Sequence, residues 1–223
     1  MRSRLRRALL LISLMLWLPL ESIGQHRRSD PNVPLGDQIE IVFENRDVIA
    51  FGAPGGSQSI RLELGEKVIW YGVQGAVGIV LTDRRVLSVS SLAGSFSETR
   101  YLRSERPPDV ALLGDRVALI TTTDRALGYD GGSGNMVEYR YGPQERVLAV
   151  RADANIGVVV TDRNLLGMSP FVGGFFTTDF HISERLERVS LAPNLATVTT
   201  SRRYLVFRSG TSIWTERKRT LKG

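Results

Sequence analysis

Hydrophobic residues in this chain fall into short runs separated by Gly, Pro, Asn or Asp. Residues 146–182 show four such runs in succession: RVLAVRAD, NIGVVVTDR, NLLGMSP and GGFFTTDFHI. Short runs that are rich in β-branched and aromatic residues and bounded by turn residues are typical of β-strands. Apolar residues do not recur at helical spacing over any window of about 11 residues. The pattern therefore predicts an all-β fold.

The four-run pattern belongs to a repeat of about 40 residues. A phrase close to TDR marks each repeat, in VLTDRRVLSV, TTTDRALGY, VVTDRNLLG and VTTSRRYLV, with a fainter copy in IVFENRDVIAF. Its arginines are spaced by 38, 41, 38 and 39 residues. An acid followed by a base keeps the same period and starts at Glu66, Glu105, Glu145 and Glu184. The sequence predicts five repeats, at 27–65, 66–104, 105–144, 145–183 and 184–223.

Four short strands in each repeat of this length are the signature of a β-propeller blade. On its period and strand count, the chain resembles five-bladed β-propellers, and the resemblance implies a propeller of five four-stranded blades. The first blade would take PNVPLG as its inner strand. Another closed or stacked all-β repeat is the alternative. A β-trefoil would have three repeats, and strands that cross a membrane would need roughly 9 to 11 residues, more than most of these runs.

The residue before each repeated arginine has a short side chain that accepts hydrogen bonds. Such side chains favour the first position of a type I turn, where they bond a backbone N–H two residues later. We therefore interpret them as turn residues rather than as metal-binding or catalytic groups. They are Asn45, Asp83, Asp124, Asp162 and Ser201.

The repeated arginines suggest planar, bidentate bonding, because lysine replaces none of them. In a four-stranded antiparallel blade, the TDR turn lies at the same end as the link to the next blade. We expect each arginine to bond a carboxylate or a free carbonyl at that blade junction, with Glu66, Glu105, Glu145 and Glu184 as the acids. The alternative is a ring of cations that binds an anionic ligand. The arginines are Arg46, Arg84, Arg125, Arg163 and Arg202.

Charged pairs spaced by two residues occur in the expected fourth strands. Side chains two apart lie on one side of a strand, and charge on an outer edge strand discourages pairing with other chains. We interpret these pairs as a solvated edge. They are Glu98 with Arg100, Glu138 with Arg140, and Glu216 with Lys218.

The first residues predict export. A basic start, MRSRLRR, is followed by an apolar stretch from Ala8 to Leu20 and by small residues up to Gly24. These are the three parts of a secretory signal peptide, and the apolar stretch is shorter than the roughly 20 residues that span a bilayer. We expect Sec-type export, cleavage after Gly24 and a periplasmic or secreted mature domain at 25–223 with no transmembrane span. The alternative is that the segment is retained as an anchor.

The charge, cysteine and histidine content of the chain argues against several classes of function. The full chain has 29 basic and 23 acidic residues, and residues 1–24 contain four arginines and one glutamate, which leaves a mature net charge of about +3. A balance that small, with its charges interspersed, gives no case for nucleic-acid binding, which needs a basic patch or stripe. The absence of cysteine excludes disulfides and thiolate sites. The only histidines, His26 and His181, have no companions at metal-ligand or catalytic spacing.

These observations favour a binding protein over an enzyme. A propeller glycosidase needs two carboxylates roughly 5 to 9.5 Å apart, whereas the expected innermost strands are mostly apolar. The sequence predicts no catalytic residue, metal or cofactor. We expect an exported scaffold for an unknown protein or glycan partner in the cell envelope. The alternatives are a lectin-like propeller that binds a carbohydrate or another anionic ligand, and a glycan-active propeller enzyme.

Overall fold

The structure is a computed structural model that describes residues 38–108 and 110–220. In these ranges nineteen β-strands form five antiparallel sheets, and consecutive strands pair in chain order within each sheet. No helix occurs in the described part of the chain. The predicted all-β fold of five repeated blades is therefore confirmed, and each sheet falls within one of the five repeat ranges.

The strands have the following bounds. The first sheet contains β1 (Ile39–Glu44), β2 (Asp47–Gly52) and β3 (Ser57–Arg61). The second contains β4 (Val68–Gln74), β5 (Val77–Thr82), β6 (Arg85–Ser90) and β7 (Phe96–Arg100). The third contains β8 (Leu112–Leu113), β9 (Val117–Thr121), β10 (Arg125–Asp130) and β11 (Asn135–Arg140). The fourth contains β12 (Val147–Asp153), β13 (Ile156–Thr161), β14 (Asn164–Met168) and β15 (Phe175–Asp179). The fifth contains β16 (Leu186–Ala192), β17 (Leu195–Thr200), β18 (Arg203–Arg208) and β19 (Ile213–Lys218).

The first sheet has three described strands where the others have four. The Leu62 N–H bonds the Arg46 carbonyl at 2.8 Å, just as the Tyr101 N–H bonds the Arg84 carbonyl at 3.2 Å in the second sheet. This match makes β1 the counterpart of β5, the second strand of its sheet. The predicted inner strand PNVPLG, at 31–36, lies outside the described residues.

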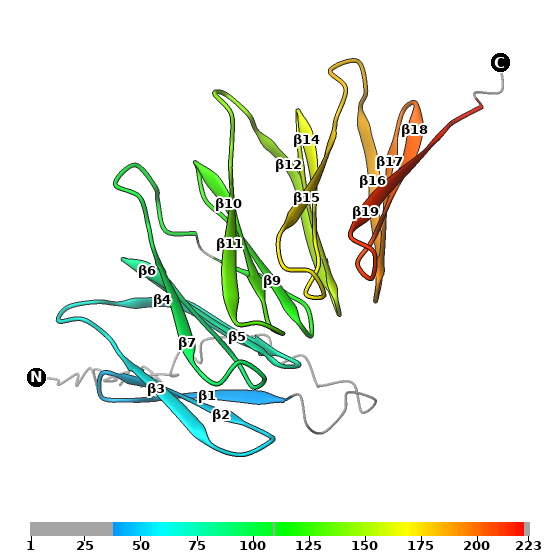
Figure 1. Ribbon diagram of the computed structural model, residues 1–223. Helices are drawn as coiled ribbons and strands as arrows, with labels where there is room; N and C mark the ends of the chain where they lie inside the picture. The colour runs from blue at the N-terminus through cyan, green and yellow to red at the C-terminus, as the bar shows by residue number, and fades with distance from the viewer. Residues whose placement is uncertain (1–37, 109, 221–223) are drawn as a thin grey trace, which may run out of the picture.

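The five sheets stack face to face in chain order, as Figure 1 shows. From the second sheet onward, each first strand lies against the next first strand, and in all five sheets each last strand lies against the next last strand. The stack opens as a fan whose two ends are the first and fifth sheets, and the sheets formed by the described residues do not close into a ring.

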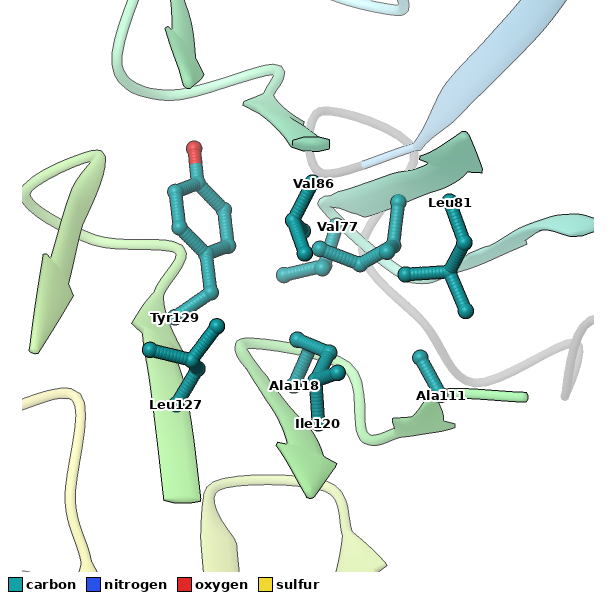
Figure 2. Packing of buried hydrophobic residues seen from close by; sticks show 9 residues of the cluster. Val77, Leu81, Val86, Ala111, Ala118, Ile120, Leu127 and Tyr129 are labelled. Carbon is teal, nitrogen blue, oxygen red and sulfur yellow. The ribbon is translucent and has the colours of Figure 1, made fainter. Parts of the chain in front are cut away.

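The hydrophobic core is divided into four clusters, one in each interface between consecutive sheets. In the cluster between the second and third sheets, Val77, Leu81 and Val86 face Ile120 and Leu127 (Figure 2). Strands β5, β6, β10 and β13 are buried on both faces because a sheet covers each side. This explains why β5 and β13, with the sequences VGIVLT and IGVVVT, are apolar at consecutive positions rather than at alternate ones.

Backbone hydrogen bonds also join neighbouring sheets at the end opposite the TDR turns. The N–H of Ala76 bonds the carbonyl of Asp115 at 2.8 Å, and the N–H of Asn155 bonds the carbonyl of Pro193 at 3.0 Å. Gly75, at φ +53°, makes the first of these contacts possible, since a Cβ there would lie 2.6 Å from the Cα and carbonyl oxygen of Asp115.

Among the described residues, no helix is long and apolar enough to cross a membrane.

We predict that Gly75→Ala destabilises the fold more than Gly94→Ala. Both glycines have positive φ, at +53° and +73°, but a methyl group on Gly94 would have no atom within 4 Å, whereas one on Gly75 would meet backbone. The extra loss for Gly75→Ala should be about 1 to 3 kcal/mol, the usual effect of overpacking. Urea unfolding of the two variants measures it, and equal losses would contradict the close approach of these sheets.

Candidate functional site at the blade junctions

A threonine organises the turn between the second and third strands of each of the last four sheets. In the second sheet, the Thr82 hydroxyl accepts the backbone N–H groups of Arg84 and Arg85, at 3.1 and 2.9 Å, and donates to the Arg85 carbonyl at 2.9 Å. The same three bonds surround the other threonines, Thr122, Thr161 and Thr200. The threonine therefore defines the structural register of the repeats.

Counted from this threonine, the repeated arginines occupy two different positions. Arg84, Arg163 and Arg202 come two residues after it, whereas Arg125 comes three residues after Thr122. The residues at the third position begin β6, β10, β14 and β18, and they are Arg85, Arg125, Asn164 and Arg203. We name Arg85, Arg125 and Arg203 the junction arginines. We name Glu66, Glu105, Glu145 and Glu184 the junction glutamates.

Arg85 is buried and bonded to two sheets. Its Nε and Nη2 donate to the two carboxylate oxygens of Glu66, each at 3.0 Å, and Nη2 also donates to the Arg61 carbonyl at 2.9 Å. Its Nη1 donates to Glu98 on β7. The side chain of Arg85 is 5% exposed and that of Glu66 is 0% exposed. Because Arg61 ends β3, this guanidinium ties the first sheet to the second.

Arg125 repeats this arrangement between the second and third sheets. Its Nε and Nη2 donate to the two oxygens of Glu105, at 2.8 and 3.0 Å. Its Nη2 also donates to the carbonyl of Arg100, the last residue of β7, at 2.8 Å, and its Nη1 donates to Glu138 on β11.

Arg203 does the same between the fourth and fifth sheets, with one bond fewer. It donates from Nε to Glu184 at 2.8 Å, from Nη2 to the Asp179 carbonyl at 2.7 Å, and from Nη1 to Glu216 on β19. The second carboxylate oxygen of Glu184 is buried and has no hydrogen-bond partner among the described residues. The last junction is thus the least satisfied of the three that contain arginine.

Asn164 takes the place of an arginine between the third and fourth sheets. Its Nδ2 donates to Glu145 at 3.0 Å and to the Tyr139 hydroxyl at 2.9 Å. The Thr161 hydroxyl shares its one proton between the Asn164 carbonyl, at 3.1 Å, and the same Glu145 oxygen, at 2.5 Å, and the Gly142 N–H donates to the other oxygen at 2.7 Å. Neutral donors satisfy the junction glutamate here.

The pKa of Glu66 is lower than its ordinary value despite burial. Burial is the largest single influence and raises the pKa of Glu66, but hydrogen bonds from Arg85, the Glu63 N–H and Thr82 together lower it. The pKa of Glu105 is lowered for the same reasons, with Arg125 as the main donor against burial. Both glutamates are therefore held as carboxylates by the groups that they bond.

The arginine partners differ from the sequence prediction. Arg46 and Arg84 bond carbonyls of the link between the first and second sheets, as expected, and Arg84 also bonds the carboxylate of Glu63. Of the arginines in the phrase, however, only Arg125 bonds a junction glutamate, and the neighbouring residues Arg85 and Arg203 take that role in place of Arg84 and Arg202. One signal was available, because residues at the junction position are spaced by 40, 39 and 39, more evenly than the arginines of the phrase. The glutamates themselves lie at the junctions.

Of the other arginines of the phrase, Arg84, Arg163 and Arg202 are exposed, and Arg46 is partly buried. Arg84 bonds Glu63 at 2.9 Å and the Leu64 carbonyl at 3.1 Å, and Arg46 bonds the Leu62 carbonyl at 2.5 Å. Arg163 and Arg202 are exposed and make no side-chain hydrogen bond or ion pair to any described residue. The partners therefore differ from one arginine to the next, and the structure does not align them as a ring of free cations.

The expected turn residues bond across the sheet rather than within the turn. Asp83 accepts the Lys67 N–H at 2.9 Å, Asp162 accepts the Arg146 N–H at 3.0 Å, and Ser201 accepts the Arg185 N–H at 3.1 Å. The threonine hydroxyl has already taken the N–H groups of the turn. Asp124 instead accepts the Ser104 hydroxyl at 2.5 Å, and Asn45 adopts a positive φ of 55° in the hairpin of the first sheet.

The glutamates of the fourth strands are not simply solvated. Glu98, Glu138 and Glu216 each accept Nη1 of a junction arginine. The interpretation of these glutamates as a protective edge missed this role. The side chain of a junction arginine is long enough to reach the fourth strand from the third strand beside it.

An open groove of about 1130 Å³ adjoins the last junction, between the fourth and fifth sheets. Its lining includes Ile182, which is 101% exposed, and Leu148, which is 45% exposed. The exposed Arg163 and Arg185 line it as well, and neither side chain bonds a described residue. Three acids balance its cations, namely Asp162, Asp179 and Glu184. In residues 38–108 and 110–220, no three His, Cys, Asp or Glu side chains meet as metal ligands.

The sequence matches no protein-family model. No curated protein matches it either. Solved structures of similar architecture include Hsv2 of Kluyveromyces lactis, with a TM-score of 0.39 and 10% identity over 82% of this chain and 70% of its own. The stack of five consecutive antiparallel sheets is by itself that of a β-propeller.

Two further similar structures match less of their own length. AztD from Citrobacter koseri has a TM-score of 0.40 and 12% identity over 81% of this chain and 59% of its own. Prp20p from Saccharomyces cerevisiae has a TM-score of 0.39 and 9% identity over 78% of this chain and 56% of its own. The chain thus spans little more than half the length of these two proteins.

We predict that Arg85→Met destabilises the fold far more than Arg84→Met. The first change leaves Glu66 buried without its cation, which usually costs about 3 to 5 kcal/mol. The second removes an exposed ion pair and should change stability by about 0 to 1 kcal/mol. Urea unfolding measures the free energy of unfolding of both variants. Similar losses in the two would contradict the assignment of Arg85, three residues after Thr82, as the junction arginine.

We predict that acid weakens the junctions. A carboxyl whose pKa is lowered on folding contributes stability that is present above its ordinary pKa of 4.5 and lost as pH falls through the lowered folded value. The advantage in unfolding free energy of the wild type over Glu66→Gln should therefore be full at neutral pH and shrink as the pH falls below about 4.5. Urea midpoints measured across this range test it, and an advantage that does not change with pH would contradict it.

Proposed function

We propose that this chain is an exported, non-catalytic binding module that holds a protein partner in the groove between the fourth and fifth sheets. The observation that carries the proposal is the lining of that groove. Ile182 and Leu148 present apolar surface next to Arg163 and Arg185, whose guanidinium groups bond no described residue. Exposed apolar side chains beside arginine are typical of protein interfaces.

The charge of the groove favours a protein over a polyanion. Asp162, Asp179 and Glu184 line it together with the arginines, so cations and anions are mixed along its length. A polyanion has no match for the apolar side chains or for the exposed Asp179, whereas a protein segment can supply apolar, basic and acidic side chains in matching order. The groove also lies on a rigid scaffold, because β12 and β16 pack against each other directly.

The amino-terminal sequence supports a site of action outside the cytoplasm. The signal-peptide pattern of residues 1–24 supports a partner in the cell envelope, either periplasmic or outside the cell. The recurring acids support a non-catalytic role, because Glu66 and Glu105 are buried in bonds to arginine and cannot reach a substrate.

Among the similar structures, Prp20p is described with binding properties toward Gsp1p and histones. Those partners belong to that protein, and the proposal for this chain rests on its own groove.

A small anionic ligand is the second candidate, and the free guanidinium groups of Arg163 and Arg185 favour it. An acidic oligosaccharide titrated into the protein at low salt tests this candidate. Saturable binding that Arg163→Gln abolishes would support it, and heat changes equal to those of buffer dilution would exclude it.

We predict that the groove contacts one partner in the envelope of the producing cell. A photo-crosslinking amino acid at Ile182, in the groove, should give a discrete protein adduct upon irradiation. The same amino acid at Leu92, which is 41% exposed in the link between β6 and β7, is the matched control and should give none. Gel electrophoresis and mass spectrometry identify the adduct.

Charge reversal in the groove tests specificity. Arg163→Glu combined with Arg185→Glu should remove the Ile182 adduct while leaving the thermal unfolding midpoint unchanged within about 2 °C, because both side chains are exposed and unbonded. Equal adducts from Ile182 and Leu92, or an adduct that survives charge reversal, would overturn the proposal.

A further inference from the structure

The first and fifth sheets each have one face that no other described sheet covers. In the first sheet, register places alternate residues of β1 and β2 on this outer face. We name it the first face, and its side chains include Glu40, Val42, Glu44, Asp47, Ile49 and Phe51. In the fifth sheet the outer residues come from all four strands. We name this the last face, and its side chains include Arg188, Leu195, Tyr204, Arg208, Ile213 and Arg217.

Both faces have an apolar centre that remains in contact with solvent. Val42 and Phe51 on the first face are 44% and 47% exposed. Tyr204 and Ile213 on the last face are 40% and 57% exposed. The corresponding faces of the three middle sheets are buried. An apolar face of a sheet is normally covered by a second layer of secondary structure.

The two faces carry opposite charges. The first face has three acids, Glu40, Glu44 and Asp47, and Arg61 lies 3.9 Å from Asp47 as its basic neighbour. The last face has three arginines, Arg188, Arg208 and Arg217. Beside it, Arg219 lies over the Tyr204 ring and is paired with Glu187 at 2.6 Å, so this pair leaves the face basic. Opposite charges around apolar centres favour contact between the two faces and disfavour contact of either face with itself.

The position of Asp47 shows how the faces would meet. Asp47 begins β2 opposite Arg61, as Arg85 begins β6 opposite Arg100, so it occupies the junction position of its sheet. Each junction arginine reaches the end of the last strand of the preceding sheet. For a first sheet stacked on a fifth sheet, that strand end is β19, where Arg217 and Lys218 lie. An acid at this junction position therefore suits a basic strand end.

We propose that the last face of one copy packs on the first face of a second copy, head to tail, in the order that the sheets follow within the chain. Figure 1 shows the two faces at opposite ends of the fan, so they do not meet within one copy. A second copy can cover each face without changing the four interfaces between sheets. Because the two contacting surfaces differ, the contact either closes a ring of copies or extends a filament.

A charge-swap experiment tests this contact on the full chain as recovered from the producing cells. The first variant combines Glu40→Lys and Glu44→Lys, which makes the first face basic. The second combines Arg188→Glu and Arg208→Glu, which makes the last face acidic. Light scattering after size-exclusion chromatography gives the mass of each protein alone and of the two variants mixed.

The wild type should show a mass of two or more chains that rises with concentration. Each variant alone should associate about tenfold or more weakly, because like charges then face each other. An equimolar mixture should regain the association, since the basic first face of one variant meets the acidic last face of the other. Association of the wild type should also weaken at high salt, which needs no variant to fold.

Three results would each overturn the proposal. One is a wild-type mass of a single chain at every concentration, which would point instead to faces that meet within one chain or remain solvated. Another is association that neither variant weakens. The third is a mixture that associates no better than its separate components.

Discussion

A buried guanidinium that bonds a carboxylate of its own sheet and a backbone carbonyl of the preceding sheet is the interaction on which the stack depends. Arg85 and Arg125 make this bridge with distances of 2.8 to 3.0 Å to their glutamates. A buried charge without its partner is strongly destabilising, so each bridge holds its sheet in one relative position. Hydrophobic packing can tolerate small sliding of sheets, whereas this bidentate geometry cannot.

Most of the architecture could be predicted from sequence because it depends on local patterns that recur. The period, the strand runs and the junction glutamates all follow from residue types at regular spacing. The junction arginines could not be assigned so easily, because their position depends on which threonine hydroxyl caps the turn. In the third repeat, Thr121, Thr122 and Thr123 follow one another, and residue type alone does not choose between them.

The remaining differences arise where a side chain reaches beyond its own strand. Glu98 is an edge residue by sequence, yet the extended side chain of Arg85 brings a cation to it. The groove near Ile182 follows from the three-dimensional link between the fourth and fifth sheets, and the matching positions of earlier repeats hold Leu64, Arg103 and Pro143. Residues that vary within a fixed scaffold carry little repeat signal, although binding often depends on them.

The neutral junction of Asn164 makes the boundaries between sheets unequal. Asn164 reaches the preceding sheet only through the Tyr139 hydroxyl and bonds no fourth-strand glutamate, whereas Arg85 and Arg125 bond both a preceding strand end and such a glutamate. Strands β12 and β13 nevertheless pack directly against the third sheet, and the Arg116 N–H bonds the Ala154 carbonyl at 2.9 Å. Apolar packing and neutral hydrogen bonds therefore hold the third and fourth blades together without the ion pair that bridges the other boundaries.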